Sequence, residues 1–554
     1  MVFRFLQGLL GSVYTVLWLL RRLVTRSPSS SPHVPLTLLT LPTDVLQLVL
    51  EMLYDPWVRD EERGRYDHET CKGRYLIPLS HCCQYLRGQT LPWIFREVYN
   101  WDRSDNSIWP EALWPCFRVV HLRDRSMRHA GNIALSPAIY DTLPMMSSLT
   151  KVTLRLNSPV PVELLHALSL APRLTLLEIY QARFDGTRDY SSLSFTRLES
   201  LVICITGFQG VLRGDNIDLA SEISNVLAFL ETLSRCLTAL RISGDLLSPA
   251  FPSLPWPKLR MFTITEHTPT PYIAVPDLVS GMPALRELVI LYTAELSRDR
   301  DAGDLYPPFV LGTADQTVLE SRSPLLTSVT LSNMEPADPI FAQLPRLLPS
   351  LHLLAMVDGY RPGKGRPPRL WPAPLTHNTV LISLEHISHL TELTDLSLTL
   401  DDFVTAPVIH RIATVFPKLR FLELGHARYK FSAQMCPDVR DPTILDALQQ
   451  FSLLTRLRIS LNFMDREFDP DTPQRRAAHW VLQGLPNLCT VAFSWEQKFY
   501  TYGFDMVVWR EWDRSVLVRP PSPPSWPPSP VPTMVEGVPM PPLELDGHGN
   551  HGVS

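Results

Sequence analysis

The sequence has few of the features that mark zinc-binding, disulfide-rich or secreted proteins. Its 8 cysteines form no C-x-x-C pair, and no histidine pair completes a zinc-type spacing. No N-x-S/T glycosylation sequon occurs in the chain. Since disulfide frameworks and sequons belong to the secretory route, these absences favour a reducing compartment. We therefore expect a cytoplasmic or nuclear protein.

The chain also lacks a charge excess and the common catalytic motifs. Its net charge is -5, so no basic surplus points to a nucleic-acid partner. No G-x-S-x-G, H-E-x-x-H or D-F-G motif is present, and His386 and His389 have no acidic or cysteine neighbour at metal-ligand spacing. We expect no enzyme, no catalytic residue, no metal site and no cofactor.

One apolar run stands at the N-terminus, within residues 1–26. It extends from Phe5 to Leu20, and arginines flank it on both sides. As a helix this run would span about 24 Å, less than the ~30 Å of a bilayer core. An uncleaved anchor, an interfacial helix and a helix packed on the body all stay open. Membrane association through residues 1–24, with the body in the cytosol, is therefore one of the alternatives.

Proline is abundant and concentrated at the C-terminus. Of the 52 prolines, many fall within residues 516–554, where the text includes PPSPPSWPPSP. Proline removes a backbone donor and fixes φ, so such a run forms neither helix nor paired strand. We predict a disordered tail there, and a second flexible segment, a Ser/Pro linker, at residues 27–35.

The strongest pattern in the chain is L-x-x-L-x-L, which recurs through residues 101–515. A single copy means little, but a dozen copies predict a leucine-rich-repeat stack. Phe117, Val120 and Leu122 form a plausible earlier copy. The centres of the copies are Val152, Leu177, Leu201, Leu240, Phe262, Leu288, Val329, Leu354, Leu396, Leu422, Leu457 and Val491.

Each copy predicts one strand of a parallel sheet, because alternate residues of a strand share a face. Segments with helical apolar spacing lie between the copies, at 162–171, 222–233, 408–416 and 443–451. The expected fold is an α/β solenoid with strands on the concave face and helices on the convex face. Asn157 and Asn462 occupy the position of the loop-binding repeat asparagine. Several copies carry a proline two residues before the first leucine: Pro172, Pro257, Pro283, Pro324, Pro349, Pro417 and Pro486.

Polar residues beside the buried leucines should face outward on the concave side. They mix both signs of charge, which favours a protein partner over a nucleic acid. We predict that they bind a protein substrate, whose identity the sequence does not contain. These residues are Lys151, Arg155, Glu178, Tyr180, Arg241, Glu287, Glu423, Arg456 and Arg458.

A short helical module, residues 36–100, precedes the repeats. Leu41-Pro42-x-Asp44-Val45-Leu46 opens an apolar helix, and Leu79-Ser80-x-x-Cys83-x-x-Leu86-Arg87 predicts a second helix after an insertion at 55–74. Leu91-Pro92-x-x-Phe95 closes the module. These motifs resemble an F-box, and their position before leucine-rich repeats is similar to fungal F-box proteins with degenerate repeats. The plain alternative is a helical cap on the solenoid.

The resemblance implies a substrate-recognition subunit of a cullin-RING (SCF-type) ubiquitin ligase. Such a box binds a Skp-type adaptor and, through it, a cullin, while the second domain captures the substrate. An amphipathic helix in so small a module should leave aliphatic side chains exposed for this contact. The expected adaptor-binding residues are Leu41, Pro42, Val45, Leu46, Val49, Leu79 and Leu86. The alternative function is a leucine-rich-repeat scaffold that binds proteins without any ligase link.

Overall fold

The protein forms a long curved sheet with helices along its outer side. The computed structural model describes residues 42–54, 76–99, 109–123, 138–156, 159–180, 183–184, 190, 192–204, 219–266, 269, 272–292, 311, 325–354, 375–400, 404–426, 442–460, 471–499 and 504–513. The N-terminal segment, the linker, the insertion at 55–74 and the proline-rich tail lie outside these residues. Within the described ranges, no helix combines the length and the apolar character that crossing a membrane requires.

The sheet has fifteen strands, which follow one another in chain order. All neighbours pair in parallel except the last two, which are antiparallel. A separate parallel pair joins β4 (Pro159–Val160) to β6 (Arg183–Phe184). The strands of the large sheet are β1 (Glu97–Tyr99), β2 (Val119–Arg123), β3 (Lys151–Arg155), β5 (Leu176–Tyr180), β7 (Ser200–Cys204), β8 (Ala239–Ser243), β9 (Met261–Glu266), β10 (Glu287–Tyr292), β11 (Ser328–Ser332), β12 (Ser350–Leu354), β13 (Asp395–Leu400), β14 (Phe421–His426), β15 (Arg456–Ile459), β16 (Thr490–Phe499) and β17 (Phe504–Asp513).

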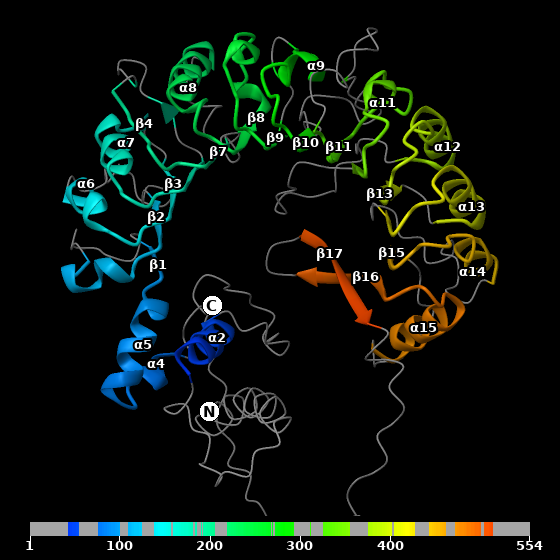
Figure 1. The fold of residues 1–554 in the computed structure, drawn as a ribbon, viewed down its shortest axis with the longest axis horizontal. Coiled ribbons are helices and arrows are strands. Elements are labelled where there is room, and N and C mark those ends of the chain that lie inside the picture. The colour runs from blue at the N-terminus through cyan, green and yellow to red at the C-terminus, as the bar shows by residue number, and fades with distance from the viewer. Residues whose placement is uncertain are drawn as a thin grey trace, which may run out of the picture.

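The helices lie outside the arc and the strands line its inner side (Figure 1). The described helices between successive strands lie over the outer face, as the crossover connections of parallel strands require. This arrangement confirms the predicted α/β solenoid with helices on the convex side. The helices are α6 (Ala138–Thr142), α7 (Val162–Ser169), α8 (Leu219–Leu233), α9 (Val275–Leu278), α11 (Ile340–Gln343), α12 (His377–His386), α13 (Ala406–Val415), α14 (Pro442–Leu448) and α15 (Asp471–Gly484), with short 3-10 turns at η1 (Glu111–Cys116), η2 (Leu143–Met145), η4 (Gly244–Leu246) and η5 (Phe251–Ser253). Four of them, α7, α8, α13 and α14, fall on the segments that the sequence predicts as helical.

Two columns of aliphatic side chains run through the whole sheet and form its core. The second residue of each five-residue strand pairs with the second residue of the next, so that Val152, Leu177 and Leu201 stand in one row. The fourth residues form another row, which includes Leu154 and Ile179. All five of these side chains are 0% exposed. Stacking buries rows that no single repeat could cover, and this burial holds the stack together.

The repeat prediction is wrong by three residues in one copy. The sequence centres that copy on Leu354, whereas the register pairs Leu351 with Val329 and Leu353 with Leu331. Leu351 is fully buried, while Leu354 is half-buried. The leucine-rich segment LLPSLHLLAM fits the L-x-x-L-x-L pattern in two frames. A proline two residues before the first leucine, here Pro349 before Leu351, favours the wrong frame. Pro349 immediately precedes its strand. In the other described copies the proline opens a two-residue turn that lies a few residues before the strand: Pro172, Pro257, Pro283, Pro417 and Pro486. Pro324 lies outside the described residues.

Asn333 performs the loop-binding role that the sequence assigns to other asparagines. Asn157 and Asn462 both lie outside the described residues. Asn333 adopts a left-handed backbone, with φ of 55°, at the end of β11. Its side-chain Nδ2 donates to the carbonyl of Tyr292 in the preceding repeat at 2.7 Å. It stands one residue before the consensus position, so the pattern does not select it.

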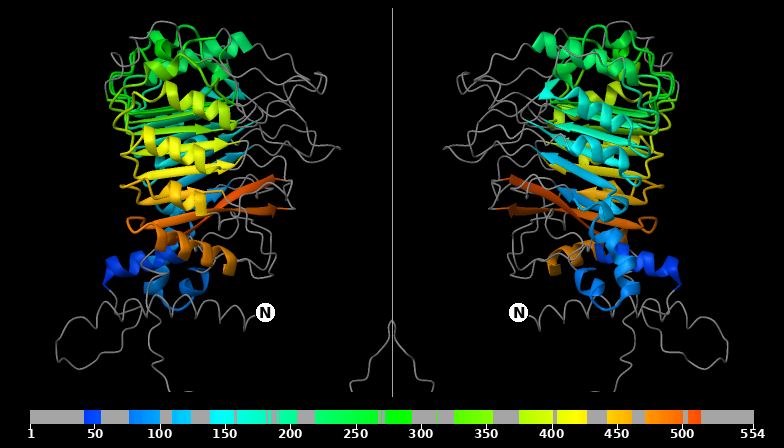
Figure 2. Two further views of the ribbon diagram at one scale, coloured as in Figure 1. Left: turned by 90° about the vertical axis from the view of Figure 1, so that its right-hand side faces the viewer. Right: turned by 90° about the vertical axis from the view of Figure 1, so that its left-hand side faces the viewer.

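Different structures occupy the two ends of the sheet (Figure 2). The helical module leads into β1 and comprises α2 (Thr43–Tyr54), α4 (Leu76–Ser80) and α5 (Gln84–Ile94). At the other end β16 and β17 form a long hairpin, ten residues in each strand. Neither the module's separate position nor the reversal of β17 follows from the leucine pattern.

Candidate functional site

The inner face of the sheet presents the first, third and fifth residues of each strand. These positions alternate with the two buried rows, so their side chains point away from the helices. All nine residues predicted to bind a substrate lie at such positions and keep solvent exposure. Leu154, Ile179 and Leu424 are buried beside them, as the predicted register requires. Their role in binding stays a prediction.

In the N-terminal half of this face, one carboxylate is fully engaged. Lys151 Nζ lies 2.7 Å from Glu178 Oε1. The other oxygen of Glu178 accepts a hydrogen bond from Thr153 Oγ1 at 2.9 Å. Lys151 and Glu178 therefore largely cancel each other's charge. The sequence identifies both residues but not their pairing, which depends on the alignment of β3 with β5.

One exposed arginine covers a tyrosine beside this pair, and a second stands two strands away. The guanidinium of Arg155 stands over the ring of Tyr180 at 5.4 Å from its centroid. Tyr180 pairs in register with Cys204 of β7, and Arg241 of β8 pairs with Val202 of the same strand. Burial raises the pKa of Tyr180, and the charges of Arg241 and Arg155 oppose this effect. We call Arg155, Tyr180 and Arg241 the arginine–tyrosine cluster.

The C-terminal half of the inner face carries a second group of charges around Phe421. Arg456 Nη2 reaches Asp395 Oδ1 at 3.3 Å, across the intervening strand. Arg458 Nη1 pairs with Glu423 Oε2 at 3.2 Å. Both guanidiniums lie over the ring of Phe421, at 4.9 and 5.7 Å from its centroid. Each arginine here has an acidic partner, whereas Arg155 and Arg241 have none among the residues that the structure describes.

His352 lies on the same face, near these acids. Burial lowers the pKa of His352, although the nearby charges of Glu423, Asp395 and Glu287 act to raise it. Its Nε2 is 3.0 Å from Ser350 Oγ. The neutral imidazole is thus favoured near pH 7. The sequence contains no local signal for His352, because its acidic neighbours come from other strands.

Between the two charged halves the inward positions of β9 to β11 are mostly uncharged. Met261 is 41% exposed there, and Val289 and Leu291 occupy inward positions of β10. The other uncharged inward side chains carry hydroxyl groups: Thr263, Thr265, Ser328, Thr330 and Ser332. A partner spanning the arc would therefore meet charge, then largely uncharged surface, then charge. Such a surface suits a protein chain better than a uniformly charged polymer.

The helical module has a hydrophobic core of its own. Its buried side chains form a cluster separate from that of the solenoid: Leu46, Val49, Leu50, Leu53, Tyr54 and Leu76. Leu46 is 0% exposed, Val49 5% and Leu86 5%. The expectation that these three face solvent for an adaptor is therefore wrong. They hold α2 against α4 and α5 in the part of the module that the structure describes.

Other residues form the apolar surface of the module. Leu48 is 58% exposed, Ile77 47% and Tyr85 45%. Of the other residues predicted to bind the adaptor, Pro42 is exposed, Val45 and Leu79 are half-buried, and Leu41 lies outside the described residues. Leu48, Ile77 and Tyr85 were missed because the helical pattern marks the apolar stripe and these residues stand off it.

The second helix of the predicted module is divided in two. Helix α4 ends at Ser80, and His81 and Cys82 form a turn. Cys83 then caps α5, its sulfur accepting from the backbone N–H of Leu86 at 3.4 Å. The prediction of one second helix from Leu79 to Arg87 is therefore wrong, because a capping residue leaves the helical conformation.

Gln47 joins the two longer helices of the module. Its Nε2 donates to Gln89 Oε1 at 2.9 Å, and its Oε1 accepts from Trp93 Nε1 at 2.8 Å. A half-buried amide that uses both ends fixes the spacing and the rotation of α2 against α5. The sequence offered no sign of this role, since Gln47 stands among leucines as an ordinary polar position.

A polar joint connects the module to the first strands. Tyr54 Oη donates to Glu97 Oε2 at 3.3 Å, and His121 Nε2 lies 2.8 Å from Glu97 Oε1. The rings of Tyr99 and His121 are stacked, with centroids 4.4 Å apart. Glu97 therefore links α2 to β2 as well as occupying β1. This contact sets the direction in which the module points from the sheet.

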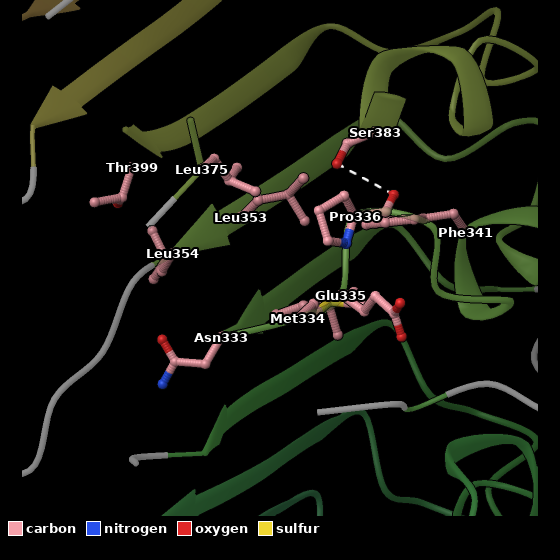
Figure 3. A pocket seen from close by; sticks show the side chains of 11 residues that line it. Asn333, Met334, Glu335, Pro336, Phe341, Leu353, Leu354, Leu375, Ser383 and Thr399 are labelled. Carbon is pink, nitrogen blue, oxygen red and sulfur yellow. Dashed lines mark hydrogen bonds between the residues drawn. The ribbon is translucent and has the colours of Figure 1, made fainter. Parts of the chain in front are cut away.

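One small pocket opens near the ends of β11, β12 and β13 (Figure 3). Leucines and Phe341 make much of its wall, and Ser383 Oγ donates to the carbonyl of Pro336 at 3.3 Å. Glu335 is the one charged residue in the lining. Across the described ranges, no three His, Cys, Asp or Glu side chains gather as metal ligands would. The charged inner face and the module are thus the better candidates for function.

Comparisons with known proteins give similar folds only. No family model and no curated protein matches the chain. Among solved structures, the Rad7 and Elc1 complex of yeast is 15% identical over 77% of this chain and 91% of that chain, with a TM-score of 0.35. The mouse RP105/MD-1 complex is 14% identical over 72% of this chain and 58% of that chain, with a TM-score of 0.33. At these scores neither likeness bears on function.

Proposed function

We propose that the chain is the substrate-recognition subunit of a cullin-RING ubiquitin ligase. In this proposal the helical module binds a Skp-type adaptor, and the inner face of the solenoid binds a protein substrate. The observation that carries the proposal is the module itself, which has a separate core and exposed Leu48, Ile77 and Tyr85. Exposed apolar side chains on a small module favour a protein partner. The F-box-like motifs of the module favour an adaptor as that partner.

The chain would do no chemistry in this role. It would hold a substrate close to a ubiquitin-conjugating enzyme and so raise its effective concentration there. The polar joint at Glu97 supports such a role, because it fixes the module relative to the binding face. A rigid link between two binding surfaces is what a positioning subunit needs.

Co-purification of the full chain with a Skp-type adaptor tests this proposal. Leu48→Glu and Ile77→Glu should each reduce adaptor recovery at least about tenfold, since a charge in an apolar contact is costly. The matched control is Leu347→Glu, because Leu347 is 73% exposed but belongs to the solenoid. Absence of adaptor from the wild-type preparation would leave a protein-binding scaffold as the function. Leu46→Asp is unsuitable as a test, because Leu46 is buried and its loss would unfold the module.

A further inference from the structure

Positive charge is unevenly distributed on the inner face. From β2 to β8 the inward positions with described side chains carry Lys151, Arg155 and Arg241 against the single acid Glu178. From β10 to β15 they carry three acids and two arginines: Glu287, Asp395, Glu423, Arg456 and Arg458. Glu266, at the end of β9 between these two groups, is only 9% exposed and contacts Ser243 of β8. Among the exposed side chains, the N-terminal half is therefore the positive end of the face.

The arginine–tyrosine cluster carries this surplus. Lys151 is neutralised by Glu178 at 2.7 Å. Among the described residues, no carboxylate forms an ion pair with Arg155 or Arg241, and both side chains are exposed. Arg155 lies over the ring of Tyr180 from β3, and Arg241 stands on β8 in register with Val202, from where its charge acts on Tyr180. Two exposed guanidiniums thus lie near one half-buried ring.

We propose that the arginine–tyrosine cluster binds the carboxylates of an acidic segment in a partner protein. This inference rests on the proposed function only in naming that partner as the substrate. A guanidinium matches a carboxylate with two parallel hydrogen bonds, and Tyr180 offers a flat surface to the adjoining chain. Val202 and Met261 lie next along the face and would contact an apolar residue that follows the acids.

The pairing of Glu178 with Lys151 leaves the two guanidiniums as the charge that a ligand would meet. Glu178 contacts Lys151 and Thr153 on the strand beside the cluster. Each guanidinium can bind one carboxylate with two parallel hydrogen bonds, and the two arginines stand on different strands. A stretch with more than one Asp or Glu is therefore the ligand that we assign to this surface.

Selection of random linear peptides on the full-length chain tests the inference. We expect the selected peptides to be rich in Asp and Glu. One of them, labelled for fluorescence anisotropy, should lose affinity at least about tenfold when its acids become Asn or Gln, since a charged hydrogen bond contributes on that order. The Arg155→Gln, Arg241→Gln double variant should lose as much, and Arg411→Gln, on the outer helix α13, should bind like wild type. Both changed side chains are exposed, so thermal melting should stay as in wild type.

Three results would overturn it. Selected peptides without acidic enrichment would do so, as would unchanged affinity in the double variant. Tighter binding of a phosphoserine version would overturn the assignment to a carboxylate. The double variant should still recover the adaptor as well as wild type does. Failure of adaptor binding in wild type, with the peptide results intact, would remove the ligase proposal and leave this binding surface.

Discussion

At the scale of single residues, Glu222 shows how one buried carboxylate can make stability depend on pH. It lies in the first turn of α8 and accepts hydrogen bonds from the backbone N–H of Phe184 at 2.8 and 3.1 Å. Burial raises the pKa of Glu222 to about 7, although Phe184 and the charge of Arg183 act to lower it. Glu222 thereby fastens the small strand β6 to α8.

Glu222→Gln should change how stability varies with pH. The folded protein holds this proton up to about pH 7, while the unfolded chain releases it near the ordinary glutamate pKa of 4.5. The free energy of unfolding of wild type therefore falls as pH rises through this window. The variant loses this slope. Between pH 5 and pH 8 its free energy of unfolding should therefore rise relative to that of wild type by on the order of 1 kcal/mol, after allowance for solvent screening.

Urea unfolding of both proteins at several pH values measures this difference. Glu231→Gln is the matched control, because Glu231 lies on the exposed side of the same helix. Parallel pH profiles for wild type and Glu222→Gln would show that the carboxyl group does not titrate in this window.

Gln47 gives a second test at this scale. Gln47→Ala removes the bonds to Gln89 and Trp93 that join α2 to α5. Each hydrogen bond contributes about 0.5–1.5 kcal/mol, so the module should lose on the order of 1–3 kcal/mol. Hydrogen exchange of the α2 amides should accelerate, while exchange in the solenoid stays as before. Equal acceleration in both parts would contradict a role confined to the module.

Sequence predicts the buried residues of the solenoid well and the exposed residues of the module poorly. Val152 and Leu177 follow from periodicity, because burial repeats every two residues in a strand. Leu46 and Val49 have the same kind of pattern, but periodicity marks a stripe without saying what covers it. In the module α4 and α5 cover that stripe. Pairings such as Arg456 with Asp395 were also beyond prediction, because they depend on register between distant strands.

At the scale of elements, the frame of β12 is the informative case. The leucine text allows two frames, and register with β11 and β13 selects the frame through Leu351. Local sequence could not decide, because Leu348, Leu351 and Leu354 are spaced three apart in a row of leucines. Neighbouring strands decide by requiring that both rows of side chains continue without a gap.

Two alanine substitutions should distinguish these frames. Leu351→Ala should reduce the free energy of unfolding by about 2–5 kcal/mol, since it leaves a cavity in a fully buried row. Leu354→Ala, three residues away, should cost less than half as much because Leu354 is half-buried. Chemical denaturation of both variants gives the comparison. A larger loss for Leu354→Ala would restore the frame that the sequence pattern first predicts.

At the scale of the whole molecule, the two hydrophobic cores are unequal. The cluster of the module contains six buried residues, whereas the other cluster continues from Val98 in β1 to Phe493 in β16. The polar joint around Glu97 connects them, and Phe95, which follows α5, packs against the larger cluster. The module should therefore open without opening the solenoid.

Native-state hydrogen exchange should resolve this difference in stability. The amides of α2 should exchange at lower denaturant than those of β13 and β14, which lie deep in the stack. A small core supports only a small free energy of opening. Exchange of both parts in one cooperative step would show that the module and the sheet form a single folding unit.

The reversal of strand direction at β17 affects whether copies of the protein can stack end to end. A parallel stack is a one-dimensional lattice, whose open edge is the same after every repeat. Such an edge is a template for another chain. The antiparallel pairing of β16 with β17 covers that edge with a strand that the repeat cannot extend. The hairpin thus stops a second copy of the protein from adding its strands to this end of the sheet. A protein truncated after residue 499 should form oligomers that lengthen with concentration in sedimentation experiments, whereas the full chain keeps one size.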